Sequence, residues 1–284
     1  MTVGRLPRFV AALAVTLLAA SHAASAPGVV FRVSNRAEIP LHEMVEDLKT
    51  ARVVFMGEEH DNRAHHAAQL TVIQALAQAG AKVAVGLEMF RADAQADLDR
   101  WVAGRLGQRQ LYEVYADNWA RRLWPLYSDI FFYALQERIP LVGLNVPRAL
   151  VAQVAREGFD ALAREDKDTL GVVECDVDER YQQLIALVLG RKDQESEAFG
   201  RFCEAQVVWD TAMAQNALRF LEANPERVLV VLAGTFHAWK HGIPEQLRRL
   251  SPLLPYRVIL PSSDKSFLRY DIVLQDADYV WWHE

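Results

Sequence analysis

Cysteine is scarce in this chain of 284 residues, which contains only Cys175 and Cys203. No CxxC pair and no Cys/His cluster is present, which excludes zinc-finger and zinc-ribbon sites. In an oxidising compartment the two thiols can pair. The sequence leaves that disulfide open, because pairing depends on how close the two residues lie in the fold.

Blocks of basic charge are missing as well. The formal net charge is −6, and the lysines and arginines are scattered along the chain. An acidic chain without a basic cluster argues against nucleic acid as the main partner. Internal repeats and low-complexity linkers are also absent, so we expect a single domain.

The N-terminus has the order of a secretory signal peptide. Two arginines precede an apolar run from Phe9 to Ala20, and small residues follow it. The run is shorter than the ~20 residues of a spanning helix, so we interpret residues 1–23 as a cleaved signal and not as an anchor. No cysteine follows the run, which argues against a lipoprotein. The predicted mature domain, 28–284, is therefore periplasmic or otherwise exported, and losing two arginines moves the charge from −6 to −8.

Short apolar runs alternate with longer amphipathic stretches over most of the chain. The apolar runs are Val53–Met56, Val83–Leu87, Leu141–Leu144 and Val228–Ala233. The amphipathic stretches are His65–Ala79, Ala92–Val102, Trp119–Glu137 and Phe199–Glu222. This alternation predicts an α/β fold, with a mostly parallel sheet flanked by helices on both faces. Two later runs, Arg257–Leu260 and Phe267–Val273, are expected to form an edge hairpin or to extend the sheet, and the tail "YVWWHE" is too short to interpret.

Ionisable or polar side chains follow each of the four predicted strands. They are Glu58, Glu59 and His60 after the first strand, Glu88 after the second, Asn145 and Arg148 after the third, and His237 after the fourth. In an open parallel sheet, ligands bind beyond the carboxyl ends of the strands. The sequence therefore predicts that these side chains converge on one site, against the alternative of separate solvated loops.

Two glutamates and two histidines carry most of this prediction. Glu58 and Glu88 lie nearest the strand ends, and buried carboxylates must be paired, protonated or bound to a metal. His60 and His237 are candidates for metal ligands, general bases, or partners of those carboxylates. Two carboxylates and two imidazoles without a thiolate suit a hard-to-borderline divalent ion.

Other polar residues near these positions have two open interpretations. His65 and His66 begin the first predicted helix, where either one of them faces the site or both lie on the surface. Arg148 is placed to hold a carboxylate, or it is solvated. Gln206 and Asp210 are four residues apart on one helix face, which indicates either a buried polar pair aimed at the site or a local helix hydrogen bond.

The order of five segments resembles a known family. "GEEHDNRAHHAAQLTVIQAL", "GLEMF", "LVGLNVPRAL", "AQVVWDTAMA" and "AGTFHAWKHGIP" are similar to segments of the ChaN-like haem-binding proteins, over roughly residues 30–260. That family belongs to a larger group with the Tiki metalloproteases and looks related to the erythromycin esterases. The resemblance implies an exported protein of iron uptake that binds haem through a tyrosine, forms a homodimer, and works with outer-membrane or periplasmic uptake components.

The resemblance leaves the haem tyrosine open among three candidates. Tyr181 follows the acidic loop "ECDVDER" and is favoured. Tyr127 and Tyr133 lie in "LWPLYSDIFFYAL", where aromatic residues also suit plain helix core. Arg148 is the candidate partner of a haem propionate. This chain has Leu189-Gly190 where the family pattern would place His-Gly, which removes the support for a histidine there.

Two functions from different classes are compatible with these residues, with a third as the plain alternative. The first is haem binding in iron acquisition. The second is a metal-dependent hydrolase or protease of Tiki or esterase type, in which Glu58, His60, Glu88 and His237 are the catalytic and metal-binding residues. The third is an exported scaffold with a degenerate site.

Overall fold

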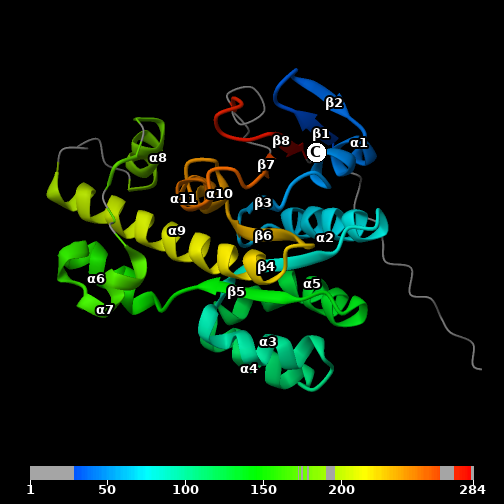
Figure 1. Cartoon of the computed structure of the whole chain (residues 1–284), viewed down its shortest axis with the longest axis horizontal. Coiled ribbons are helices and arrows are strands. Elements are labelled where there is room, and N and C mark those ends of the chain that lie inside the picture. Colours follow the sequence, from blue (N-terminus) through cyan, green and yellow to red (C-terminus); the bar gives the residue numbers. More distant parts are fainter. Residues whose placement is uncertain are drawn as a thin grey trace, which may run out of the picture.

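Eight strands form one twisted sheet in the part of the chain that the structure describes (Figure 1). The computed structural model describes residues 29–171, 173, 175–177, 179–189, 196–262 and 272–282. The predicted signal peptide lies outside these ranges, as does most of the run Phe267–Val273. The strand order is β2-β1-β8-β7-β3-β6-β4-β5.

The central strands are parallel to one another, and they contain the apolar runs noted in the sequence. They are β3 (Val53–Glu58), β4 (Val83–Arg91), β5 (Leu141–Asn145), β6 (Val228–Gly234) and β7 (Tyr256–Ser262). Strand β3 pairs with β6 on one side and β7 on the other, and β6 pairs with β4. Burial on both faces explains why these strands read as unbroken apolar runs. The predicted α/β fold with a mostly parallel sheet is confirmed.

One edge of the sheet decides between the two interpretations of the late run Arg257–Leu260. This run lies in β7 and pairs in parallel with β3, so it extends the sheet, as one of the two interpretations predicted. The C-terminal tail, whose sequence alone gave no interpretation, forms β8 (Tyr279–Trp282) parallel to β7. Strands β1 (Val29–Arg32) and β2 (Ala37–Ile39) then close this edge as an antiparallel hairpin beside β8. Short strands give local signals too weak to predict without their neighbours.

Helices α1 to α5 cover one face of the sheet (Figure 1). They are α1 (Leu41–Leu48), α2 (Arg63–Gln78), α3 (Gln95–Val102), α4 (Gln108–Asn118) and α5 (Trp124–Glu137). From β3, Val54 and Met56 face this layer, whereas Val53 and Phe55 face the opposite one. The two-residue period of a strand therefore divides one apolar run between two cores.

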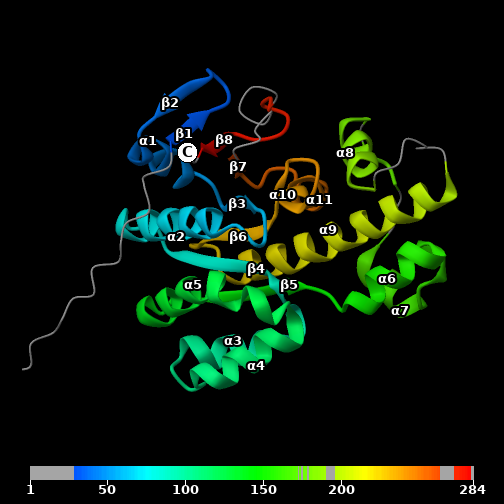
Figure 2. The same ribbon diagram turned by 180° about the vertical axis from the view of Figure 1, so that it is seen from behind.

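The opposite face is covered by a long helix and two short ones. These are α9 (Glu197–Ala223), α10 (Thr235–Ala238) and α11 (Ile243–Leu250). The C-terminal half of α9 packs on the sheet, while its N-terminal half extends beyond it (Figures 1 and 2). Around that extension lie α6 (Arg148–Glu157), α7 (Arg164–Leu170) and α8 (Glu179–Leu189), which share a smaller third core with it. This side lobe supplies one wall of the cavity described below.

Two predicted helices begin later than their amphipathic pattern suggested. The stretch from Trp119 opens with extended backbone at Trp119 itself and a 3₁₀ turn, Arg121–Leu123, before α5. The stretch from Ala92 likewise opens with a 3₁₀ turn, Ala92–Ala94, before α3. A proline at the start of α5 suits the first turn, where its missing N–H has no helical partner. No helix among the residues of the described ranges has the length and apolarity to cross a membrane.

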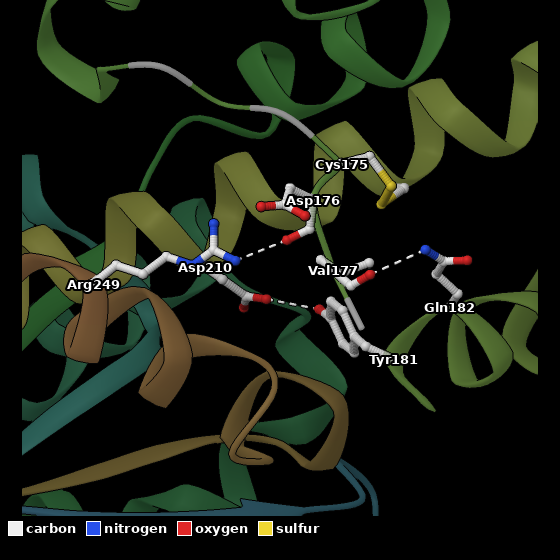
Figure 3. Close-up of a disulfide and its surroundings, with 8 residues drawn as sticks. Cys175, Asp176, Val177, Tyr181, Gln182, Asp210 and Arg249 are labelled. Atoms are coloured by element: carbon white, nitrogen blue, oxygen red, sulfur yellow. Dashed lines mark hydrogen bonds between the residues drawn. A yellow bond between two sulfur atoms is a disulfide. The ribbon is translucent and has the colours of Figure 1, made fainter. Parts of the chain in front are cut away.

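The two cysteines form a disulfide that ties the side lobe to α9 (Figure 3). Cys175 precedes α8, Cys203 lies in α9, and their Cα atoms are 5.5 Å apart. The structure therefore pairs Cys175 with Cys203, a disulfide that the sequence had left open. The bridge lies close to Tyr181 on α8 and to Asp210 on α9 (Figure 3).

We expect reduction of this disulfide to lower the free energy of unfolding by roughly 2–4 kcal/mol. The two residues are 28 positions apart, and reduction frees a loop of that size in the unfolded chain. Urea unfolding with and without dithiothreitol measures the difference. The double variant Cys175→Ser, Cys203→Ser serves as the control, because its midpoint should not respond to reductant. An identical midpoint for the oxidised and reduced wild type would contradict the prediction.

Candidate functional site

The carboxyl ends of β3, β4 and β6 open into a cavity of ≈ 670 Å³. Its apolar walls are built from three indole rings and two phenyl rings, those of Trp119, Trp209, Trp239, Phe202 and Phe236. Its volume lies within the range of cavities that hold small organic ligands and cofactors, about 300–1,000 Å³. The four residues predicted at the strand ends, Glu58, His60, Glu88 and His237, all line it. The structure therefore brings them together at one edge of the sheet.

Glu58, the last residue of β3, is the centre of a buried hydrogen-bond network. Its Oε1 accepts a hydrogen bond from the hydroxyl of Tyr127 on α5 and lies 2.8 Å from Nδ1 of His60. Its Oε2 accepts a bond from Nε2 of Gln69 at 2.7 Å and lies 3.4 Å from Nδ1 of His66. Every oxygen of this buried carboxylate therefore has partners, as burial requires.

The same network shifts the pKa values of its members. Burial alone raises the pKa of Glu58, but the bond from His60 and the adjoining His66 leave it below its ordinary value. Burial lowers the pKa of His60, yet the bond to Glu58 and the nearby charge of Glu88 raise it above the ordinary value overall. The pair therefore favours the carboxylate and the imidazolium, with the His60 side chain 37% exposed towards solvent.

Glu88 lies where β4 departs from its regular pairing. The register between β4 and β5 shifts between Leu87 and Arg91, so the segment around Glu88 bends out of the ladder. Oε2 of Glu88 accepts a bond from the backbone N–H of Gly234 at 2.6 Å, and Oε1 lies 3.8 Å from Nε2 of His237. The irregularity thus places a buried carboxylate between the ends of β4 and β6.

His237 lies on α10 and is held by a residue of α9. Its Nδ1 is 2.6 Å from Oδ1 of Asp210, and Oδ2 of Asp210 accepts a bond from the hydroxyl of Tyr181 at 2.8 Å. Burial raises the pKa of the Asp210 carboxyl. Burial by itself lowers the pKa of His237, but the Asp210 and Glu88 carboxylates offset this and raise it to about 9. The raised pKa of His237 therefore favours its imidazolium form, with the carboxyl groups of Asp210 and Glu88 on either side of the ring.

We expect the protein to lose stability as the pH rises from 6.5 through about 9, because the folded-state pKa of His237 lies above its ordinary 6.5. The contribution of a raised pKa is complete below the unfolded value and is lost as the pH passes the folded one. At ~1.4 kcal/mol per pKa unit, the loss is roughly 3–4 kcal/mol. Urea unfolding across pH 6 to 10 measures it. His237→Gln should flatten most of this slope, and an equal slope in both proteins would contradict the assignment.

The two helix-start histidines are both buried, so the alternative that both lie on the surface is wrong. His65 lines the cavity, and its Nδ1 accepts a bond from the backbone N–H of Glu59. His66 bonds to Gln69 and to the carbonyl of His60. Asn62 caps the helix that carries them, since its side chain accepts from the N–H of Ala64.

The polar pair of α9 faces the site, as one of its two interpretations predicted. Gln206 lines the cavity, while Asp210 is fully buried behind it and binds His237 and Tyr181. The hydrogen bonds of Asp210 therefore run to other helices and are not local to α9.

The structure places the candidate haem residues in different environments. Tyr181 lines the cavity, with its hydroxyl on Asp210. Tyr127 lies behind Glu58, and burial together with that carboxylate raises the pKa of its phenol. Tyr133 is half-buried on α5 against the first core. Arg148 begins α6, is exposed, and places its guanidinium 5.0 Å from the ring centre of Trp119 at the cavity. None of these contacts tests haem ligation, which stays a prediction.

Sequence reasoning missed the aromatic walls and several polar partners. Trp119, Trp209 and Trp239 come from three distant segments, and only their joint placement makes a cavity. Gln69 follows Asn62 by seven residues, which is about two helical turns. Helical periodicity could therefore have predicted that Gln69 lies on the side of this helix that faces Glu58, to which it donates a hydrogen bond. Arg122, a second exposed arginine at the cavity, had no distinguishing signal.

A metal centre is not preformed in the described part of the chain. Among these residues, no group of three or more His, Cys, Asp or Glu side chains is arranged to hold a metal ion. Nδ1 of His60 and Nδ1 of His237 are each bound to a carboxylate, which leaves one nitrogen on each ring for a ligand. The predicted metal-binding role of the strand-end residues therefore stays a prediction.

Comparison with known proteins assigns this chain to a family. The model of the family described as haem-binding uptake, Tiki superfamily, ChaN matches residues 44–247, which include all four strand-end residues. The chain belongs to the ChaN family. The resemblance noted in the sequence is thereby confirmed.

Three known proteins are similar to this chain in structure or in sequence. The structure of ChaN of Campylobacter jejuni, with cofacial haem, is 21% identical and has a TM-score of 0.67 over 89% of this chain and 95% of that one. The erythromycin esterase EreC is 17% identical, with a TM-score of 0.47 over 78% of this chain and 72% of that one. The chloroplastic protein RETICULATA-RELATED 5 of Arabidopsis thaliana is 22% identical over 255 residues, 84% of this chain. The chain spans 35% of that relative's length. At these identities the structural likeness shows the fold alone.

Proposed function

We propose that this protein binds haem in the cavity at the strand ends and serves iron acquisition outside the cytoplasm. Membership of the ChaN family supports the ligand class. The observation that carries the proposal is the cavity itself, because its walls of indole and phenyl rings suit a flat apolar macrocycle. Haem supplies an iron that tyrosinate or imidazole can ligate.

The residues around the cavity fit the other needs of haem. Two exposed arginines, Arg122 and Arg148, are available to pair with the propionates, and guanidinium groups bind carboxylates well. Tyr181 is the proposed iron ligand, because it lines the cavity while Tyr127 lies behind Glu58. His60, with its partly exposed ring, is the alternative ligand.

We expect haemin titration of the mature protein to give a saturable change in the Soret band. Tyr181→Phe should weaken binding more than about tenfold and change the spectrum, because it removes the ligand oxygen. Tyr133→Phe is the matched control, since this residue packs in the first core and lies off the cavity. His60→Ala distinguishes the alternative ligand. Failure of the wild type to bind haemin would remove the proposal, whereas an unchanged Tyr181→Phe protein would remove only the tyrosine assignment.

The proposal includes export and a homodimer, with outer-membrane or periplasmic uptake components as partners. The order of charged, apolar and small residues in 1–23 supports export. N-terminal sequencing of protein from its native host tests this, and an intact Met1 would contradict it. Sedimentation with and without haemin tests the dimer, which should form or strengthen when the ligand is shared between two copies.

A metal-dependent hydrolase is the second candidate, and one observation favours it. His60 and His237 each have Nδ1 on a carboxylate, the usual support for a histidine that ligates metal through its other nitrogen. Oε1 of Glu88 lies 3.8 Å from Nε2 of His237, so a carboxylate is present beside the second ring nitrogen. Elemental analysis of purified protein tests the candidate: a stoichiometric divalent ion that disappears in His237→Ala supports it, and a metal-free wild type after incubation with Zn²⁺ and Mn²⁺ removes it.

A further inference from the structure

Asn145 is a strand-end residue that the haem proposal does not use. It is the last residue of β5, its side chain is buried, and it is not among the residues that line the cavity. Its Nδ2 donates a hydrogen bond to the backbone carbonyl of Glu88 at 2.6 Å, and its Oδ1 accepts one from the indole Nε1 of Trp209, also at 2.6 Å. Both partners line the cavity. One buried carboxamide therefore links two elements of the cavity wall, β4 and α9.

The two partners of Asn145 require a carboxamide at this position. A backbone carbonyl can only accept a hydrogen bond, and an indole N–H can only donate one. The side chain between Glu88 and Trp209 must therefore donate on one side and accept on the other, which asparagine does and alanine does not. The same requirement fixes which end of the carboxamide faces each partner. Its Oδ1 also accepts from the backbone N–H of Val146 at 2.8 Å, which holds the side chain close to its own backbone.

Strands β4 and β5 lose their regular register beside Asn145. Three residues of β4, 88–90, lie opposite the single residue Leu144 of β5. A Cβ at Gly143 would lie 2.3 Å from the carbonyl oxygen of Arg91, so the irregular segment passes close to β5 where glycine leaves room for it. The carbonyl of Glu88 belongs to this segment and accepts the bond from Asn145. Asn145 therefore holds the part of β4 that carries the Glu88 carboxylate.

The bond from Trp209 fixes the plane of one aromatic ring in the cavity wall. Trp209 is partly buried on α9, and its ring packs edge-on against the imidazole of His237, with 4.7 Å between the ring centroids. An indole side chain turns about two bonds, and the hydrogen bond at Nε1 together with this packing restricts both. A ligand that lies against Trp209 meets a ring that is already oriented, so less side-chain freedom is lost on binding.

We propose that Asn145 is a positioning residue of the cavity, which orients the Trp209 ring and the Glu88 segment and so preforms the slot for a flat aromatic ligand. The inference rests on the proposed haem function, and it extends that function to a residue outside the cavity wall. It involves no iron ligand and no change of protonation.

The alternative is an Asn145 that only docks α9 on the sheet, and Asn216 shows such a contact. Asn216 lies on α9 two helical turns beyond Trp209, and its Nδ2 donates to the backbone carbonyl of Leu144 at 2.7 Å. Asn145 and Asn216 thus each join α9 to the end of β5 through a carboxamide. Asn216 is not among the cavity-lining residues and contacts none of the three indoles of the wall through this bond.

Asn145→Ala and Asn216→Ala form a matched pair, since each removes one carboxamide between α9 and β5. We expect both to lower the melting temperature. The Kd for haemin should rise about tenfold in Asn145→Ala, because the indole of Trp209 then loses its rotational freedom only on binding. It should stay within about twofold of wild type in Asn216→Ala. Equal Kd values in the two variants would overturn the inference, because a purely structural Asn145 affects binding as Asn216 does.

The indole N–H of Trp209 reports the state of the wall without any ligand. Its NMR resonance in the haem-free protein is assigned by its loss in Trp209→Phe. We expect this proton to exchange with solvent about tenfold faster in Asn145→Ala, because it loses its acceptor, and at the wild-type rate in Asn216→Ala. An unchanged rate in Asn145→Ala would overturn the inference. Failure of the wild type to bind haemin, with the exchange rates as expected, would instead overturn the proposed function, so the two failures are distinguishable.

A comparison of two indoles keeps the inference testable if Asn145→Ala does not fold. Trp209→Phe and Trp239→Phe remove the same part of a cavity-lining ring, but Nε1 of Trp239 has no hydrogen-bond partner among the described residues. We expect haemin binding to weaken more in Trp209→Phe, because only this change also removes a bond that sets the plane of the ring. Equal losses of haemin affinity in these two variants would overturn the inference.

Discussion

Replacing Gly242 by alanine is expected to destabilise the protein by about 2–3 kcal/mol, the upper range for overpacking a well-packed site. A Cβ at this position would lie 2.4 Å from the carbonyl oxygen of His237 and 2.8 Å from that of Phe236. Both contacts are with backbone, so no side-chain rotation relieves them. The segment that must move is α10, which carries His237. We therefore expect haemin binding to weaken together with stability.

Gly200→Ala is the control for this variant. Gly200 lies within α9 and a Cβ there would meet nothing within 4 Å. Alanine is the better helix former by roughly 0.5–1 kcal/mol, so this change should raise the free energy of unfolding. Urea unfolding measures the change in the free energy of unfolding for each variant, and we expect the two changes to have opposite signs. Equal midpoints for Gly242→Ala and wild type would show that the α10 turn adapts and would refute the prediction.

Glu58→Ala should cost on the order of 3–5 kcal/mol, the usual loss when one member of a buried charged network is removed. This substitution removes the hydrogen-bond partner of three groups at once, namely the hydroxyl of Tyr127, the side-chain amide of Gln69 and Nδ1 of His60. We also expect the pKa of His60 to fall, since the bond to Glu58 is among the causes of its rise. Thermal melting and NMR titration of the histidines measure the two effects.

Glu59→Ala is the matched control, because the next residue along the chain is an exposed glutamate whose carboxylate accepts a bond from the side-chain amide of Asn62. Such a surface change usually stays within about 0.5 kcal/mol. Glu58→Gln separates charge from shape, since it retains the volume and one acceptor oxygen. A Glu58→Ala protein as stable as Glu59→Ala would mean that the network adds no stability.

The sequence determined the layers of this fold and the edge at which the site lies. Strand and helix periodicity are local properties, so Val53–Met56 and its three counterparts were predictable without any partner. The ends of those strands were predictable in the same way, and parallel pairing brings Glu58, Glu88 and His237 to one edge whatever their separation. Strand β8 could not be predicted from the sequence, because a run of four residues is too short to show a strand pattern.

The tertiary structure alone decided which side chains became partners. Tyr127 reaches Glu58 over 69 positions, and Asp210 reaches Tyr181 over 29 and His237 over 27. The sequence placed aromatic and acidic residues on helices, but it contained nothing that specified these pairs. A buried carboxylate must find hydrogen-bond donors, and which donors are within reach depends on how α5, α8, α9 and α10 pack against the sheet. Helix packing, which no local pattern encodes, therefore decided the chemistry of the site.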